Sequence, residues 1–300
     1  MVATANAVTY CGARPVLVDS RPDTWNMDVH AIEDRITADT RAIIVVHIYG
    51  HPVDMTPVLA LAKRYGLWVV EDAAEAHGAQ FLDRPVGSLG DVASFSMYAN
   101  KNLTTGEGGV VTTNNADIAL RAQTLRDQAF SPERHFWHRY RGFNYRMTSM
   151  QAAVGLAQTE RFAELIGARR ALAEQYAERL SSLPGLTLPI ELERVVNVYW
   201  MFGIVVQDAF GISRDTLRAR LAEKGIETRC FFIPMHHQPI YEDLFAEQRY
   251  PVADELCQRG LYLPTFSGLA RDAVDMICDA VAEARTPKKS LTHDAATTSE

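Results

Sequence analysis

SFSMYANKNLTTGEGGVVTT, residues 94–113, carries the strongest structural signal in this 300-residue sequence. An apolar and hydroxyl-bearing run, which we expect to be a strand, ends at Lys101. A glycine-rich turn follows, and residues 110–113 are expected to form a second strand. A lysine at the end of a buried strand is suited to Schiff-base chemistry, because burial lowers its pKa from roughly 10.4 and frees the amine to attack a carbonyl. Ser96, five residues earlier, offers a hydroxyl to a phosphate oxygen.

A second apolar run ends in acidic residues 29 positions before Lys101. It reads WVVED, residues 68–72, and small residues and a turn follow it. In an open parallel sheet, ligands bind beyond the carboxyl ends of the strands, so Asp72 and Lys101 are expected at the same edge. A lysine, a buried carboxylate and a hydroxyl match the needs of pyridoxal phosphate: the lysine forms the Schiff base, the acid keeps the pyridine nitrogen protonated, and the hydroxyl anchors the phosphate.

Seven segments resemble the nucleotide-sugar aminotransferases of the DegT/DnrJ type, and the resemblance runs from about residue 2 to residue 285. It implies an α/β chain with the aspartate-aminotransferase-like fold of pyridoxal phosphate enzymes (fold type I). In that fold a mainly parallel sheet is sandwiched by helices and is followed by a smaller α+β domain. The matching segments are HIYGHP (47–52), DAAEAHG (72–78), FSMY (95–98), NKNLTTGEGG (100–109), GFNYRM (142–147), YWMF (199–202) and RCFFIPMH (229–236).

The resemblance also implies roles for particular residues. Lys101 is the catalytic residue that holds the cofactor, Asp72 contacts the ring nitrogen, and Glu75 contacts the ring hydroxyl. Ser96 binds the phosphate, and Asn144 reaches the phosphate of a neighbouring copy, so we expect a homodimer with shared active sites. The implied reaction moves an amino group from L-glutamate to a keto sugar, expected to be a nucleotide-linked 4-keto-6-deoxy sugar. Residues 225–241 resemble the GDP-perosamine synthases of the family most.

Three rival functions differ from this interpretation in one feature each. A sugar dehydratase on the same fold carries histidine in place of the lysine, so Lys101 argues against it. A cyclitol aminotransferase of antibiotic synthesis keeps every motif and differs only in its acceptor. A truncated, non-catalytic relative with a binding or regulatory role is favoured only by the expected lack of the family's amino-terminal segment before residue 3. In the family a phosphate-gripping segment precedes the helix expected at residues 3–11, and we expect a chain beginning at Met1 to bind the cofactor more weakly.

Several candidate residues also have a purely structural explanation. Asp72 is also interpretable as a helix N-cap, Glu75 as a solvated acid, and Asn144 as a turn residue. His77 is favoured as a core histidine. Of the adjacent histidines 236 and 237, one is a candidate for substrate contact, although loop packing is the favoured explanation.

No metal site is expected. His47 and His51 have the i,i+4 spacing of zinc ligands on a helix, but Gly50 and Pro52 break any helix there.

Composition excludes other classes of function. The net charge is −7, and the basic residues form no cluster before 285–289, which argues against a nucleic-acid partner. No run of 18 apolar residues indicates a membrane span, and the first residues lack a basic signal-peptide region. The four cysteines, Cys11, Cys230, Cys257 and Cys278, show no paired spacing, which predicts reduced thiols and a cytoplasmic protein.

Alternating patterns predict a parallel α/β sheet and two domains. We expect a cofactor-binding large domain over 1–160, a small carboxy-terminal domain over 161–285, and a disordered tail over 286–300. Expected strands are 16–19, 42–47, 68–72 and 195–206, and expected helices are 29–35, 57–65, 148–183, 216–224, 252–259 and 273–285.

Overall fold

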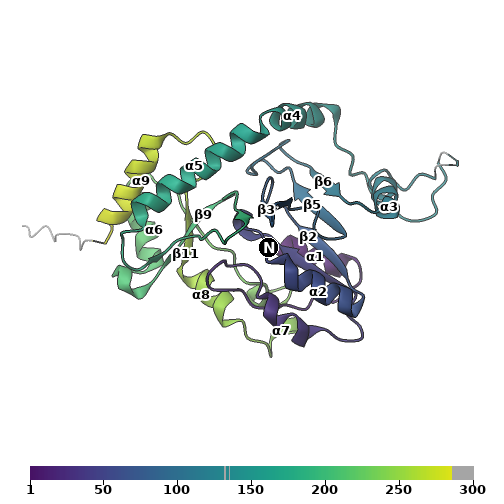
Figure 1. The fold of residues 1–300 in the computed structure, drawn as a ribbon, viewed down its shortest axis with the longest axis horizontal. Helices are drawn as coiled ribbons and strands as arrows, with labels where there is room; N and C mark the ends of the chain where they lie inside the picture. Colours follow the sequence, from purple (N-terminus) through teal and green to yellow (C-terminus); the bar gives the residue numbers. More distant parts are fainter. Residues whose placement is uncertain (132, 135, 286–300) are drawn as a thin grey trace, which may run out of the picture.

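A four-stranded sheet lies near the middle of the chain's fold (Figure 1). The computed structural model describes residues 1–131, 133–134 and 136–285. The strand order is β1–β2–β5–β6, in which β1, β2 and β5 are parallel and β6 is antiparallel to β5. The expected α/β class is therefore confirmed. The strands are β1 (Ala42–Val46), β2 (Trp68–Asp72), β5 (Val92–Ser96) and β6 (Gly109–Thr112).

The register of this sheet aligns the ends of its parallel strands. Asp72, the last residue of β2, is opposite Val46 at the end of β1 and opposite Ser94 in β5. The carboxyl ends of the three strands therefore share one edge, which is where ligands bind in open α/β sheets. Helix α2 (Met55–Tyr65) packs on this sheet through Met55, Val58 and Ala62.

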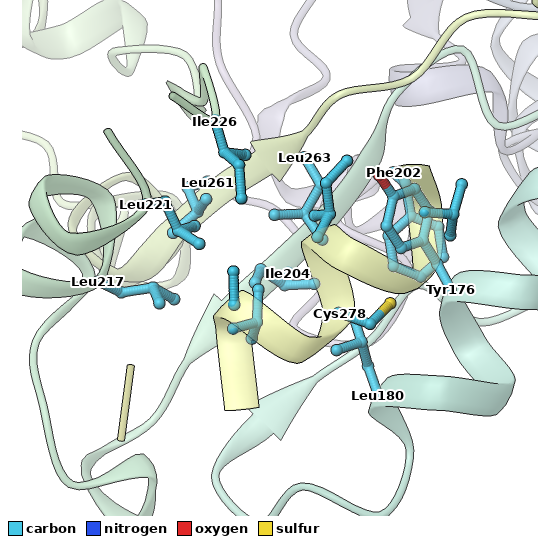
Figure 2. Packing of buried hydrophobic residues seen from close by; sticks show 14 of the residues in the cluster. Tyr176, Leu180, Phe202, Ile204, Leu217, Leu221, Ile226, Leu261, Leu263 and Cys278 are labelled. Atoms are coloured by element: carbon cyan, nitrogen blue, oxygen red, sulfur yellow. The ribbon is translucent and has the colours of Figure 1, made fainter. Parts of the chain in front are cut away.

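A second sheet is antiparallel, with the strand order β10–β11–β9–β7. The pleat of β9 sends Phe202, Ile204 and Val206 into a core formed with three helices, which Figure 2 shows from close by. Val205 points into a different, aromatic cluster on the opposite face. The strands are β7 (Leu186–Thr187), β9 (Phe202–Val206), β10 (Arg229–Cys230) and β11 (Gly260–Leu263), and the helices are α5 (Phe162–Leu180), α6 (Arg214–Glu223) and α9 (Arg271–Glu283).

Two helices replace the single long helical stretch expected at 148–183. Helix α4 (Ser149–Glu160) begins with a capping box between Thr148 and Gln151, and the chain leaves helical geometry at Arg161 before α5 starts. Helix α5 then reaches both cores, because Ile166 belongs to the core of the first sheet and Tyr176 to that of the second. The domain boundary at residue 160 stays a prediction, and the predicted tail, 286–300, lies outside the described residues.

Some expected elements differ in the structure. Residues 16–19 form no strand; instead the Asp19 carboxylate accepts hydrogen bonds from the backbone N–H groups of Val252 and Ala253, at the start of α8 (Pro251–Arg259). The expected helix at 29–35 is two short 3₁₀ turns, η1 (Val29–Ala31) and η2 (Glu33–Arg35). The expected strand at 195–206 is divided into β8 (Val195–Val196) and β9 by an irregular segment.

The remaining elements are short or peripheral. Within the described part of the chain, no helix is both long and apolar enough to cross a membrane. These elements are α1 (Val2–Tyr10), η3 (Ile48–Gly50), β3 (Gln80–Phe81), β4 (Arg84–Pro85), α3 (Ala116–Arg126), η4 (Asp208–Phe210), η5 (Met235–His237), α7 (Glu242–Phe245) and α8 (Pro251–Arg259).

Candidate active site

Lys101 lies in the turn between β5 and β6, not at the end of a strand as expected. Strand β5 ends at Ser96, because the chain turns back at Met97, whose carbonyl accepts from the N–H of Thr105 at 2.9 Å. The N–H of Lys101 donates to the carbonyl of Tyr98 at 3.0 Å and tightens the turn. This geometry directs the lysine to the carboxyl edge of the sheet on a short, hydrogen-bonded turn.

The Lys101 side chain is only 7% exposed and lies between an acid and an aromatic ring. Its Nζ is 3.7 Å from Oε1 of Glu75 and 3.8 Å from the centroid of the Trp200 ring. Burial lowers the pKa of Lys101, while the charges of Glu75 and Asp72 partly oppose that change. Proton loss from this ammonium is therefore easier than in water, which favours the nucleophilic amine.

Glu75 is 3% exposed, so its interpretation as a solvated acid is wrong. Its Oε2 accepts a hydrogen bond of 2.7 Å from the N–H of Tyr49, but Oε1 has no hydrogen-bond partner among the described residues. Burial raises the pKa of Glu75 to about 7, against the lowering effects of Lys101 and the Tyr49 N–H. Apart from the 3.7 Å ion pair with Lys101, this buried oxygen lacks a hydrogen-bond donor, and a bound hydroxyl group would supply one.

The segment at residues 47–52 holds Tyr49 in place for this contact. Tyr49 has a positive φ of 54°, and Gly50 follows with φ 97°. A Cβ at Gly50 would lie about 3.0 Å from the backbone nitrogens of Tyr199 and Trp200, so only glycine fits. This close approach brings residues 198–200 against the site.

Asp72 ends β2 and organises the turn that carries Glu75. Its Oδ1 accepts from the N–H of Ala74 at 3.2 Å, and its Oδ2 accepts from the hydroxyl of Thr4 in α1 at 2.5 Å. Residues 73–79 form a turn and not a helix, so Asp72 is not a helix N-cap. The carboxylate is half-buried and lies near enough to Lys101 to act on it electrostatically.

Two further polar side chains belong to this region: Ser96 ends β5, and His77 is acted on by the charge of Lys101. Ser96 is half-buried, and its Oγ accepts from the N–H of Tyr98 at 3.2 Å. His77 is buried against Phe95 and lies beside the backbone of Ser96, but among the described residues no partner has good hydrogen-bond geometry at either ring nitrogen. Burial lowers the pKa of His77 to about 4, and the Lys101 charge acts in the same direction, so the ring is neutral.

Asn144 lies outside this group. It is exposed, on the segment that follows α3, where it forms an isolated bridge with Asp127. Among the described residues, no hydrogen bond or ion pair joins Asn144 to Lys101, Asp72, Glu75 or Ser96. Figure 1 shows this segment at the periphery of the fold, beside α3. One chain therefore assembles four of the five predicted site residues and leaves Asn144 apart.

Sequence reasoning missed a buried pair beneath the site, His47 and Glu71. Both side chains are fully buried, and their Nε2 and Oε2 atoms are 3.2 Å apart. Nδ1 of His47 accepts from the N–H of Val53, so Nε2 carries the proton that is donated to Glu71. Glu71 also accepts three backbone N–H groups, from Gly87, Leu89 and Gly90, and its pKa is lowered despite the opposing effect of burial. This pair joins β1, β2 and the loop before β5, a role that spacing alone does not indicate.

His236 and His237 point the same way, not apart as expected for a strand. They belong to η5, and their Nε2 atoms lie 2.9 and 2.7 Å from the same Oδ1 of Asp254. In the described part of the chain, these residues are the one group of three or more metal-ligand types close together. Their mutual hydrogen bonds support the loop-packing explanation.

The side chains around Lys101 fit pyridoxal phosphate. They supply an amine of lowered pKa, a carboxylate at the strand edge, and Oε1 of Glu75, which has no hydrogen bond. In that order, these groups would suit the aldehyde carbon, the ring nitrogen and the ring hydroxyl of that cofactor.

Comparisons with known proteins identify the family of this chain. Residues 1–282 match the model of the DegT/DnrJ/EryC1/StrS aminotransferase family. The chain is 42% identical to a GDP-perosamine synthase of Escherichia coli O157:H7, over 94% of this chain and 76% of the relative. It is 44% identical to a GDP-perosamine synthase of Caulobacter vibrioides, over 93% and 76% of the two chains.

A solved structure of a related protein has the same fold as this chain. S. venezuelae DesV superposes with a TM-score of 0.89 at 36% identity, covering 96% of this chain and 77% of the other. The predicted aspartate-aminotransferase-like architecture is thereby confirmed. The chain belongs to the DegT/DnrJ/EryC1/StrS aminotransferase family and is a pyridoxal phosphate-dependent sugar aminotransferase.

Proposed function

We propose that this enzyme transfers the amino group of L-glutamate to a 4-keto-6-deoxy sugar linked to GDP. The observation that carries the proposal is the buried amine of Lys101, 3.7 Å from Glu75 at the carboxyl edge of the sheet. The nucleotide and the sugar class are suggested by the 42% and 44% identity to two GDP-perosamine synthases. The four cysteines are free thiols, which supports the cytoplasm as the compartment.

We assign two tasks to Lys101: to hold the cofactor through Nζ and, when released, to move the proton at the reacting carbon of each substrate. Pyridoxal phosphate, when bound, supplies an electron-withdrawing ring that stabilises negative charge on that carbon. The lowered pKa of Lys101 suits both tasks, because a nucleophile and a general base must each act as the neutral amine.

The neighbouring residues are assigned to hold and tune the cofactor. Asp72 would keep the ring nitrogen protonated, Glu75 would accept from the ring hydroxyl through Oε1, and Ser96 would contact the phosphate. The contacts of Asp72 with Thr4 and Ala74 keep its carboxylate oriented. The lack of a hydrogen bond at Oε1 of Glu75 supports its assignment.

We propose a homodimer in which Asn144 completes the phosphate site of the other copy. Support comes from apolar side chains that face solvent on α4 and on the segment carrying Asn144: Met150 is 82% exposed and Tyr145 is 73% exposed. Exposed apolar area of this kind marks a protein–protein surface. A two-fold arrangement would place the same surface of both copies in contact. Other exposed apolar residues in these segments are Phe136, Trp137, Phe143, Val154 and Leu156.

Shared sites predict complementation between two inactive variants. Lys101→Ala and Asn144→Ala are each expected to be inactive, but refolding them together should restore about one quarter of the wild-type activity, because half of a random mixture is mixed dimers with one intact site. The matched control is Lys101→Ala refolded with Asp72→Asn. Both of these residues belong to the same chain's site, so no intact site forms. Activity in the control, or none in the first mixture, contradicts shared sites.

The proposed reaction is tested directly with purified enzyme, pyridoxal phosphate and L-glutamate. GDP-linked and dTDP-linked 4-keto-6-deoxyhexoses are offered separately, and mass spectrometry follows the aminated sugar and 2-oxoglutarate. We expect amination of the GDP-linked sugar. Preference for the dTDP-linked sugar would overturn the proposed nucleotide, and amination of a keto-cyclitol alone would support the cyclitol aminotransferase instead.

A further inference from the structure

Trp200 makes two contacts with the lysine turn although it lies 99 residues further along the chain. Its ring centroid is 3.8 Å from Nζ of Lys101, and its indole N–H donates to the carbonyl of Asn100 at 2.9 Å. Nearby, the side-chain amide of Asn102 lies 3.5 Å from the carbonyl of Val198. The segment between β8 and β9 therefore contacts the turn on both sides of Lys101 in sequence.

Trp200 is itself held rigidly, with 4% of its surface exposed. Its N–H donates to the carbonyl of Tyr49 at 2.9 Å, and its carbonyl accepts from the buried guanidinium of Arg169 at 2.9 Å. The rings of Tyr49 and Phe232 stack on it at interplanar angles of 20° and 17°. The N–H of Tyr49 also donates to Glu75. Tyr49 therefore connects Trp200 and Glu75, the two groups that contact the Lys101 amine.

The two neighbours act differently on the amine. Glu75 attracts the ammonium by its charge, which depends on the protonation of a carboxyl with a pKa of about 7. The face of an indole ring attracts a cation through its quadrupole and carries no titratable group. The ring can therefore hold the ammonium whether Glu75 is charged or neutral.

We propose that Trp200 is a positioning residue that holds the amine of Lys101 when that amine is not bonded to the cofactor, and fixes the lysine-bearing turn through Asn100. This inference rests on the proposed role of Lys101. It gives the released amine a defined place beside Glu75, within the site and away from water. The contact depends on the ring face and not on apolar bulk alone.

The test measures the protonation of Lys101 in the full chain from which pyridoxal phosphate has been removed. Reductive methylation with labelled formaldehyde is run across a pH series, and peptide mapping gives the pH midpoint for residue 101. The charges of Glu75 and Asp72 act on Lys101, the Lys101 charge in turn acts on His77, and the buried amine of Met1 interacts with Glu75 and Asp72. All four groups are left unchanged. Three variants are compared with wild type: Trp200→Met, Trp200→Phe and Trp25→Met. Trp25 is a control from the same aromatic cluster, buried to a similar extent.

Loss of the ring face should make the ammonium less stable. In Trp200→Met the midpoint is expected to move to lower pH, corresponding to an acid dissociation constant about 2- to 30-fold larger. Trp200→Phe keeps a weaker ring face and should lie between wild type and Trp200→Met, so it decides the question if Trp200→Met does not fold. Trp25→Met should match wild type.

A midpoint at or above the wild-type value in either Trp200 variant would overturn the proposal. If Trp200 only filled space, its replacement would loosen the site and admit water, which stabilises the ammonium. The pH midpoint of Lys101 would then rise, whereas the proposal predicts that it falls. An equal shift in Trp25→Met would also overturn it. If pyridoxal phosphate were found attached to a residue other than Lys101, the proposed function would fail, while the methylation result would still report on the contact itself.

Discussion

The Lys101→Ala variant is expected to lack the visible absorbance of lysine-bound pyridoxal phosphate. Its turnover should fall by more than about 10⁴-fold, which is the upper end of the effect of one general base. The loss should be that large because one amine performs both tasks. Absorbance spectra and a coupled assay of 2-oxoglutarate measure the two effects.

The matched control for this prediction is Lys63→Ala. Lys63 is exposed on α2, and its replacement should leave spectrum and turnover unchanged. Turnover within tenfold of wild type in Lys101→Ala would show that another group performs the chemistry.

Asp72→Asn is expected to lower turnover by several orders of magnitude while some cofactor remains bound. The amide keeps the shape of the carboxylate and an oxygen that can accept from Thr4, but it lacks the charge that holds a proton on the pyridine nitrogen. Single-turnover kinetics and a cofactor titration separate the two properties.

Thr4→Val provides the comparison, because it removes the hydroxyl that binds Asp72 and leaves the charge. It should have a much smaller effect than Asp72→Asn. Near wild-type turnover in Asp72→Asn would mean that this carboxylate only organises the turn through Ala74.

The centre of the fold and the edge that carries Asp72 were predictable from the sequence. Parallel strands place their carboxyl ends together, so a strand that ends in Asp72 and a following strand before Lys101 imply one shared edge. The expectation of a strand at 16–19 was wrong. A short apolar run gives no information on whether a neighbouring strand is free to pair, and here Asp19 instead binds the first N–H groups of α8.

Contacts made across long sequence separations were not predictable. Trp200 belongs to a recognised segment, but nothing in its spacing indicates that its ring meets the amine of Lys101. That contact depends on the close backbone approach at Gly50 and on the guanidinium of Arg169. The burial of Glu75 was likewise not predictable, because its contacts are with Tyr49 and Lys101, both more than 20 residues away along the chain. The role of Asn144 stays a prediction, because one chain does not bring it to the site.

The central claim is that the amine of Lys101 is the point of attachment for pyridoxal phosphate. Borohydride reduction of the cofactor-loaded enzyme makes that attachment permanent, and proteolysis with mass spectrometry locates it. The account predicts a single label on the peptide containing residue 101, and none on that peptide when reduction follows incubation with L-glutamate. A label on any other lysine, or a label at Lys101 that glutamate does not remove, would contradict it.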